Sequence, residues 1–249
     1  MRSTVGLALC LVSVVVLQAG CSSRQPDELI VFAAASLQPA FTELGSHFEK
    51  DHPGTKVTFN FAGSSDLLTQ LIQGAPADVF ASADTRSMTK AADAGLISGE
   101  PVNFASNTLT MVTPPGNTRG IASFADLAKP GTQVVVCAPQ VPCGAATEQL
   151  ERVTGVRLNP VSEESAVTDV LGKITSAQAD AGVVYLTDAT RAGNEVSSIP
   201  FPESRAVVNT YPIAELQNAV DPPAAQQFID LVTGPRGRVV FAAAGFGPP

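Results

Sequence analysis

The sequence predicts an α/β protein whose strands are largely parallel. Short runs rich in β-branched and aromatic residues alternate with segments of helical period along most of the chain. The junctions from strand to helix repeatedly carry small residues followed by serine, and no internal repeat or low-complexity block interrupts the pattern. Alternation of this kind is typical of a parallel sheet covered by helices. The length of 249 residues allows one large domain or two lobes of ordinary size.

The first residues have the features of a secretory signal. A run of apolar and small residues spans 5–17 and is followed by "QAGC", which ends at Cys21. The run is too short for a membrane span, so we expect residues 1–20 to be a signal peptide. The small residues before the cysteine resemble a bacterial lipoprotein cleavage site, although Gln18 replaces the usual aliphatic residue; ordinary signal cleavage nearby is the alternative. A lipid on Cys21 and a flexible tether over residues 21–28 would anchor an exported chain to the outer face of the cytoplasmic membrane.

The charge of the chain is strongly acidic. It has 15 basic and 23 acidic residues, and removal of the signal takes away one basic residue, so that 14 against 23 gives a net charge of −9 in place of −8. Binding to nucleic acid depends on neutralising phosphates with Lys and Arg. We therefore expect no nucleic acid among the partners.

The four cysteines fit an exported protein. Cys10 lies in the signal and Cys21 is the candidate for lipidation, which leaves Cys137 and Cys143. Their spacing suits a small disulfide loop in an oxidising compartment. A metal site is not expected, because two thiols without nearby histidines do not complete a tetrahedral shell.

The first strand and helix are predicted from "LIVFAAASLQPAF". A strand over residues 29–35 ends in three alanines, and Ser36 follows as a candidate N-cap for the next helix. Pro39 then lies in the first turn, where its missing N–H does little harm. The helix is predicted from one apolar stripe at spacings of four, three and four: Leu37, Phe41, Leu44 and Phe48.

The same order of strand, small residues and helix recurs along the chain. "KVTFNFAGSSDLLTQLI" is a strand and a helix that buries Leu67, Leu68, Leu71 and Ile72, and "ADVFASAD" carries a strand over Ala77–Ala81. The remaining predicted elements are a strand ending at Cys137, a helix beginning near Gly144, a helix in "SEESAVTDVLGKI" capped by Ser165, a strand ending at Tyr185, and helices over Pro223–Val232 and Arg236–Ala244.

Two extended stretches, "NTLTMVTPPG" and "RAVVNTYPIAEL", bracket the middle hundred or so residues. That length is appropriate to a second domain. If both stretches cross between lobes, lobe one is discontinuous and consists of residues 27–108 plus 211–249, and lobe two consists of residues 109–210.

The sequence gives little support to an enzyme. The only histidines, His47 and His52, lie at the end of a predicted helix and in its following loop, away from any junction of strand and helix. A serine nucleophile needs a base within hydrogen-bond reach, and neither "AAAS" nor "AGSS" has the elbow sequence of the hydrolases. We therefore expect no catalytic residues, and an extracellular serine hydrolase is kept as an alternative.

An uncharged anion site is the better supported interpretation. Ligands of parallel α/β folds bind at the carboxyl ends of the strands, where helix N-termini point free N–H groups outward. Ser36 and either Ser64 or Ser65 lie at two such junctions, each after alanine or glycine. One serine there is usually only an N-cap, but two junctions with the same small residues favour a ligand. No lysine or arginine accompanies them, so a nucleotide-binding loop is not indicated.

The order of these pieces resembles one family, the periplasmic molybdate-binding proteins. The resemblance covers nearly the whole mature chain and rests on "VFAAASL", "FAGSSDLLTQLIQGAPADVFASAD", "VPCGAA" and "AGVVY", in this order. It implies the type II periplasmic binding protein fold, with two α/β lobes joined by two crossover segments and the ligand in the cleft. It further implies a monomeric receptor that captures molybdate, and tungstate, for the membrane permease of an ABC importer. A receptor of the same fold for another oxyanion, such as sulfate, is the alternative.

The resemblance also implies which residues bind the anion. Ser36 would be a ligand as well as a cap, Cys143 stands where the family commonly has alanine, and Ser65 is the weaker candidate beside Ser64. No cofactor is implied, and the side chains would contact only the oxygens of molybdate, with no direct bond to the metal. The implied donors are the hydroxyl and backbone N–H groups of Ser36 and Ser64, the backbone N–H groups of Cys143 and Val167, and the phenol of Tyr185.

Such a site has consequences for selectivity. All of its donors are neutral, and it offers no acceptor for a proton on the ligand. A protonated oxyanion such as phosphate would leave its O–H unpaired, at a cost of about 1–3 kcal/mol. Sulfate carries no proton at neutral pH, so it would have to be excluded by its smaller size.

Overall fold

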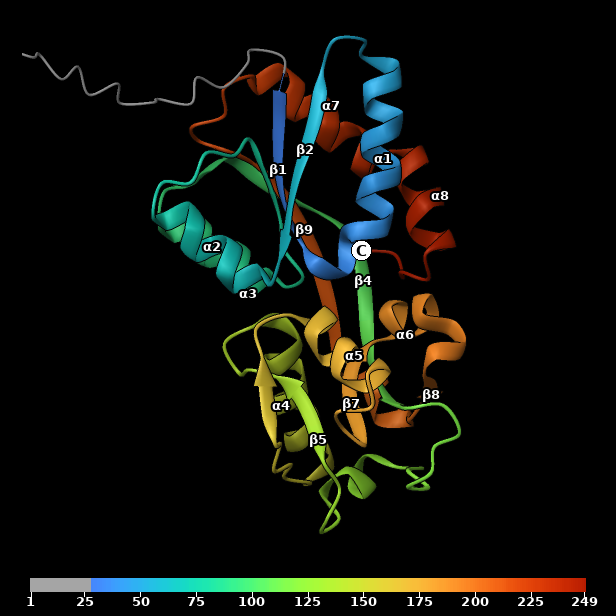
Figure 1. The fold of residues 1–249 in the computed structure, drawn as a ribbon. Helices are drawn as coiled ribbons and strands as arrows, with labels where there is room; N and C mark the ends of the chain where they lie inside the picture. Colours follow the sequence, from blue (N-terminus) through green and yellow to red (C-terminus); the bar gives the residue numbers. More distant parts are fainter. Residues whose placement is uncertain (1–27) are drawn as a thin grey trace, which may run out of the picture.

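The structure of the protein is a computed structural model that describes residues 28–249. The predicted signal peptide, Cys21 and the tether up to residue 27 lie outside the described residues. The described chain forms two α/β lobes connected by two long strands (Figure 1). The strands are β1 (Glu28–Ala34), β2 (Lys56–Ala62), β3 (Val79–Ala81), β4 (Ile97–Thr113), β5 (Val134–Cys137), β6 (Ser162–Glu164), β7 (Ala181–Tyr185), β8 (Ser197–Ile199) and β9 (Val208–Leu216).

Helices cover the sheet in both lobes (Figure 1). The α-helices are α1 (Gln38–Asp51), α2 (Ser64–Ile72), α3 (Thr85–Asp93), α4 (Pro142–Thr154), α5 (Val167–Thr175), α6 (Leu186–Ala192), α7 (Pro222–Thr233) and α8 (Pro235–Ala243). Short 3₁₀ helices are η1 (Ala35–Leu37), η2 (Phe124–Ala128), η3 (Gly193–Glu195) and η4 (Pro202–Ala206). Across residues 28–249, no helix combines the length and the apolar character that a membrane span requires.

The strands form one path that passes through both lobes. Their order is β2-β1-β3-β9-β4-β7-β5-β6, and β8 pairs with β4 beside this path. In lobe one β1 is parallel to β2 and β3, and in lobe two β5 is parallel to β6 and β7. The α/β class is therefore confirmed, but the expectation of largely parallel strands is wrong, because the sheet is mixed. The antiparallel pairs all involve β4 or β9.

The two predicted crossing segments are β4 and β9. They pair with each other from Ile97 opposite Leu216 to Thr108 opposite Val208, and β4 then continues into lobe two beside β7. Each segment thus contributes to the lobe that it leaves and to the lobe that it enters (Figure 1). The predicted lobe boundaries fall inside these two strands and stay a prediction.

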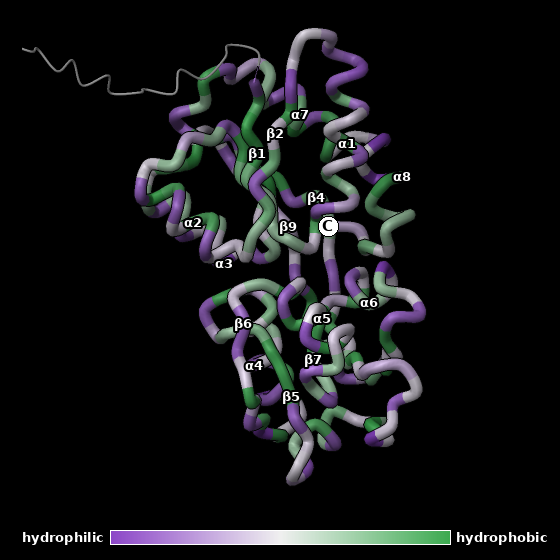
Figure 2. The backbone as a smooth tube through the Cα atoms, viewed as in Figure 1, coloured by the Kyte–Doolittle hydropathy of each residue, from purple (hydrophilic) through white to green (hydrophobic). Residues whose placement is uncertain are grey.

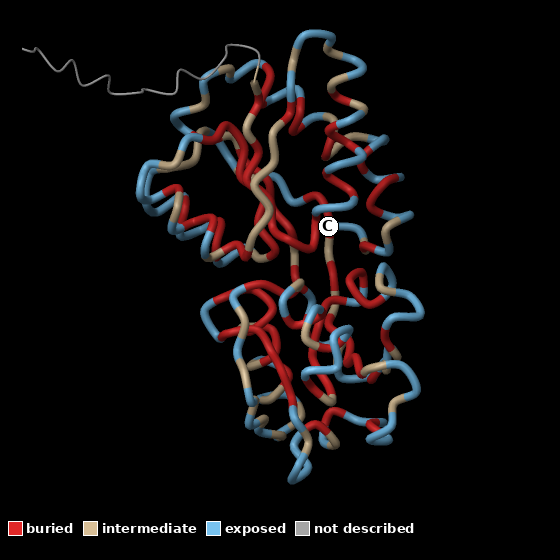
Figure 3. Tube along the Cα trace, in the orientation of Figure 1, coloured by how far each residue is buried: buried red, intermediate tan, exposed pale blue. Residues whose placement is uncertain are grey.

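Each lobe has an apolar interior, against which its strands and helices pack. β5 reads "VVVC" and is buried along its whole length, as expected for an inner parallel strand. In lobe one, the ring of Phe41 on α1 lies 5.9 Å from the rings of both Phe104 and Phe228, which fixes α1 and α7 against the sheet. Buried residues follow β1, β5 and β7, whereas most of β2 is only half-buried (Figure 3). Hydrophilic and hydrophobic residues alternate along the helices (Figure 2).

Three predictions about individual residues were wrong. Ser36 does not cap α1, because a 3₁₀ turn intervenes and the N-cap of the helix is Leu37, without a side-chain hydrogen bond. Ser165 does not cap α5 either; the N-cap is Ala166, and the acidic residues before it pair with β5 as strand β6. Ile72 is 60% exposed although it was expected to be buried with the other apolar residues of α2.

Candidate functional site

A small cavity lies between the two lobes, with a volume of about 20 Å³. Its walls include the five residues that the family resemblance implies as anion ligands. Ser65, the weaker candidate, is not among the lining residues. The cavity is lined by Ala34, Ala35, Ser36, Ala62, Gly63, Ser64, Ala83, Val141, Pro142, Cys143, Ser165, Ala166, Val167 and Tyr185.

Strand ends and helix beginnings bring these residues together. Ser36 lies in the turn after β1, and Ser64 is the first residue of α2 after β2. From lobe two, Cys143 and Val167 lie in the first turns of α4 and α5, and Tyr185 is the last residue of β7. Helix N-termini present backbone N–H groups that have no partner within the helix, so the site is rich in donors.

Small residues let the two lobes approach closely at this cavity. Gly63 of lobe one lies against the backbone of Ser165 of lobe two, and a Cβ built on Gly63 would be 2.0 Å from the Ser165 carbonyl oxygen. Such a distance is far inside van der Waals contact. The glycine is therefore needed for the close approach of the lobes and not for its backbone angles, since its φ of −59° suits any residue.

Ser64 and Tyr185 are held by one hydrogen-bonded group of buried atoms. The Ala83 N–H donates to Ser64 Oγ over 3.0 Å. Asn209 Nδ2 on β9 donates both to the Ala83 carbonyl, over 2.9 Å, and to Tyr185 Oη, over 3.0 Å. A single residue of lobe one, Ala83, and a crossing strand thus position hydroxyls from both lobes.

Ser36 belongs to a second group of hydrogen bonds. Its hydroxyl lies 3.1 Å from Tyr211 Oη, which is also approached by Asn107 Nδ2 at 3.5 Å. Asn107 on β4 donates to Thr187 Oγ1 of lobe two over 2.8 Å. Tyr211 and Tyr185 are the only tyrosines of the chain, and their rings meet edge to face at 5.9 Å.

Tyr211, Asn107 and Asn209 were missed from the sequence. All three side chains are buried on the crossing strands, with exposures of 0%, 4% and 6%. Polar side chains inside a buried strand must find hydrogen-bond partners. The stretches "SNTL" and "VNTYP" show polar residues among the apolar residues of the crossing strands, which is where such partners are needed. Only the fold shows which partners these residues find.

Comparisons with known proteins agree with this geometry. Residues 29–247 match a family model described as bacterial extracellular solute-binding protein. The chain belongs to this family. The molybdate-binding protein ModA of Mycobacterium tuberculosis H37Rv is 49% identical over 258 residues, which cover 98% of this chain and 99% of that protein. A sulfate-binding protein of Synechococcus elongatus is 26% identical, over 91% of this chain and 74% of that protein.

A solved structure supports the fold of this solute-binding protein. The periplasmic molybdate-binding protein of Azotobacter vinelandii superposes with a TM-score of 0.77 at 24% identity, over 89% of this chain and 99% of that one. The prediction of a type II periplasmic binding protein fold is therefore confirmed. At this level of identity the likeness concerns the fold alone.

The electrostatics of the cavity in this solute-binding protein come from dipoles and not from formal charges. Its lining residues include no lysine, arginine or histidine and no carboxylate. Burial raises the pKa of both Tyr185 and Tyr211, so both phenols keep their protons at neutral pH. The hydroxyls are therefore available as donors.

One buried carboxylate lies behind the site. Asp188 on α6 is 1% exposed, and burial raises its pKa to about 6 although Arg191, 3.6 Å away, acts in the opposite direction. The carboxylate also accepts a hydrogen bond from the backbone N–H of Tyr185, which is the N-cap of α6. Its contribution is to hold the end of β7, since it does not line the cavity.

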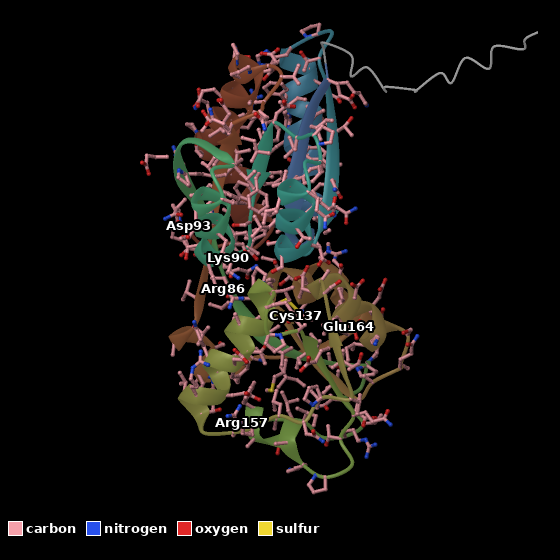
Figure 4. All side chains as sticks on the ribbon, turned by 90° about the vertical axis from the view of Figure 1, so that its left-hand side faces the viewer. Arg86, Lys90, Asp93, Cys137, Arg157 and Glu164 are labelled. Atoms are coloured by element: carbon pink, nitrogen blue, oxygen red, sulfur yellow. A yellow bond between two sulfur atoms is a disulfide. The ribbon has the colours of Figure 1, made fainter. Side chains whose placement is uncertain are left out.

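A disulfide-closed loop forms one contact between the lobes. Cys137 and Cys143 are bonded, and the loop between them carries Pro139 and Gln140. Ser65 Oγ of lobe one donates to the Gln140 carbonyl over 2.8 Å, and Arg86 Nη2 donates to the carbonyls of Gln140 and Pro139 over 2.9 and 3.3 Å. Arg86 lies where the two lobes meet (Figure 4). Ser65 therefore joins the lobes beside the cavity and does not line it.

Proposed function

We propose that this protein is the receptor that captures molybdate, and tungstate, outside the cytoplasm and delivers it to the membrane permease of an ABC importer. The observation that carries the proposal is the cavity itself. Hydroxyls and helix N-termini from both lobes converge on it, and no charged side chain lines it. The ModA protein of M. tuberculosis, with 49% identity over almost the full length, supports molybdate as the ligand.

The proposed ligands are the residues predicted from the sequence. Ser36, Ser64 and Tyr185 would donate their hydroxyl protons to the oxygens of molybdate, and no residue would bond to the metal. The backbone N–H groups of Ser36, Ser64, Cys143 and Val167 would complete the shell. A hydrogen bond to a charged group contributes about 1.5–3 kcal/mol, so seven donors can offset the desolvation of a dianion. This function needs no cofactor.

Capture by donors from both lobes explains how binding is signalled. An anion held by Ser64 of lobe one and Val167 of lobe two draws the lobes together, and closure about β4 and β9 creates a surface that a permease can recognise. We propose that the mature chain acts as a monomer and is tethered to the outer face of the membrane by a lipid on Cys21. The oxidising compartment outside the cytoplasm suits the bond between Cys137 and Cys143.

A hydrolase is less well supported by the site. Ser36 and Ser64 lie in the cavity, but neither histidine of the chain lines it. Ser64 Oγ accepts from a backbone N–H, and Ser36 Oγ faces a neutral phenol, so neither serine contacts a base among residues 28–249. Nucleophilic catalysis would require one.

Calorimetric competition tests the proposal. We expect molybdate and tungstate to bind the purified mature chain, and sulfate and phosphate to bind at least about 100-fold more weakly, because phosphate carries an unpairable proton and sulfate leaves the donors too far away. Equal affinity for sulfate would favour the receptor for a different oxyanion. Absence of molybdate binding would refute the proposed function.

A further inference from the structure

The direction of the hydrogen bond between Asn209 and Tyr185 can be assigned from the neighbouring atoms. Asn209 Nδ2 lies 2.9 Å from the Ala83 carbonyl oxygen, which can only accept. The amide nitrogen, and not the amide oxygen, must therefore face this side. The same nitrogen lies 3.0 Å from Tyr185 Oη. An amide NH₂ group only donates, so the phenol oxygen accepts.

Tyr185 therefore does not donate its proton to Asn209. A phenol has one proton to donate, and Tyr185 lines the cavity with 1% of its surface exposed. The lone pair that faces Asn209 is occupied, so the O–H is left for one of two partners, the neighbouring hydroxyl of Tyr211 or an anion in the cavity. The same holds for Ser64: its Oγ accepts a hydrogen bond from the Ala83 N–H, so its own proton can be donated to another group.

We propose that Asn209 is a positioning residue that sets the specificity of the site by directing the Tyr185 proton into the cavity. The inference rests on the proposed function and deepens it. Asn209 does not line the cavity and does not touch the anion; it acts through Tyr185. With its acceptor side occupied, Tyr185 can donate to a fully deprotonated oxyanion and offers nothing to the O–H of a protonated one.

The consequence can be tested by reversing the hydrogen bond. Asn209→Asp keeps the shape of the side chain but presents an acceptor to Tyr185, whether the new carboxyl group is ionised or donates its proton to the Ala83 carbonyl. Tyr185 would then donate to position 209 and turn a lone pair toward the cavity. A protonated oxyanion gains a partner from this change, and a deprotonated one loses a donor.

The experiment compares molybdate with hydrogen arsenate in mildly alkaline buffer, where both are tetrahedral dianions but only arsenate keeps a proton. A general loss of affinity through added charge or local damage affects both ligands and cancels in the ratio of their affinities. We expect the ratio of molybdate to hydrogen arsenate affinity to fall at least about tenfold in Asn209→Asp. In the control Asn209→Leu, which leaves the same carbonyl unpaired but adds no acceptor, the ratio should stay within about threefold of wild type.

A double-mutant cycle keeps the inference testable if Asn209→Asp does not fold. Asn209→Leu should weaken molybdate binding about two- to tenfold in the wild-type background and less than about twofold in the Tyr185→Phe background. An unchanged ratio in Asn209→Asp, or losses that add fully in the cycle, would overturn the role of Asn209 while wild type still binds molybdate. If wild type itself binds no molybdate, the proposed function fails and the inference fails with it.

Discussion

A chain in which Gly63 is replaced by alanine is expected to lose tight molybdate binding while remaining folded. A methyl group at this position would lie 2.0 Å from the Ser165 carbonyl oxygen of the opposite lobe. Backbone atoms face each other there, so no flexible side chain can move aside. The lobes would have to stay apart, and the donors of lobe two, which include Tyr185 and the N–H of Val167, would not reach an anion held by lobe one.

The expected loss is at least about 100-fold in affinity, because several hydrogen bonds to a charged ligand are lost together. Stability is expected to change little, since the backbone angles of Gly63 suit alanine and the clash exists only when the lobes are closed. Gly172→Ala on α5 is the matched control, because nothing lies within 4 Å of a Cβ there. Calorimetry measures the affinity, and small-angle scattering measures whether molybdate still compacts the chain. Wild-type affinity in Gly63→Ala would show that closure at this contact is not required.

The second large effect is expected from a pair of adjacent serines. Ser64→Ala removes a hydroxyl donor from the cavity and leaves the buried Ala83 N–H without its acceptor. Loss of one hydrogen bond to a charged ligand corresponds to about 1.5–3 kcal/mol, so molybdate affinity should fall roughly 10- to 150-fold. The unpaired N–H should also lower the free energy of unfolding by about 1–3 kcal/mol.

Ser65→Ala provides the comparison for Ser64→Ala. Its hydroxyl joins the lobes through the Gln140 carbonyl and does not line the cavity. The loss of a neutral hydrogen bond near solvent should weaken binding by no more than about tenfold. Titration of both variants with molybdate, together with urea unfolding, decides between the two serines. Equal losses in the two variants, or a larger loss in Ser65→Ala, would contradict the assignment of Ser64 as the ligand.

The sequence predicts the fold well because its signals are local. The stripe that includes Phe41 and Leu44 predicts the buried face of α1, and the word "AGVVY" predicts β7 and its end at Tyr185. The small residues after β1 and β2 predict where backbone can approach backbone, and the cavity lies there. The residues that indicate a strand end, a helix beginning or a close approach of the backbone lie within a few positions of one another in the sequence. They can therefore be recognised without knowledge of the fold.

The parts of the site that depend on distant contacts could not be predicted in the same way. Ser36 resembles a helix cap in sequence, but in the structure its hydroxyl faces Tyr211, 175 residues further along the chain. Asn209 is an ordinary polar residue in sequence, and its role depends on Ala83 and Tyr185, which come from different lobes. That the predicted residues bind an anion stays a prediction; their convergence on one cavity is a finding of the structure.

The most direct test of the proposed anion site is a crystal structure of the mature chain grown with molybdate, with diffraction measured on both sides of the molybdenum absorption edge. We expect one strong anomalous peak in the cavity between the lobes. The oxygens around it should lie within about 2.6–3.2 Å of the hydroxyls of Ser36, Ser64 and Tyr185. No lysine or arginine should contact these oxygens, and no protein atom should bond to the metal. A peak at any other place, or a peak in the cavity whose oxygens contact none of these hydroxyls, would contradict the assignment of Ser36, Ser64 and Tyr185 as molybdate ligands.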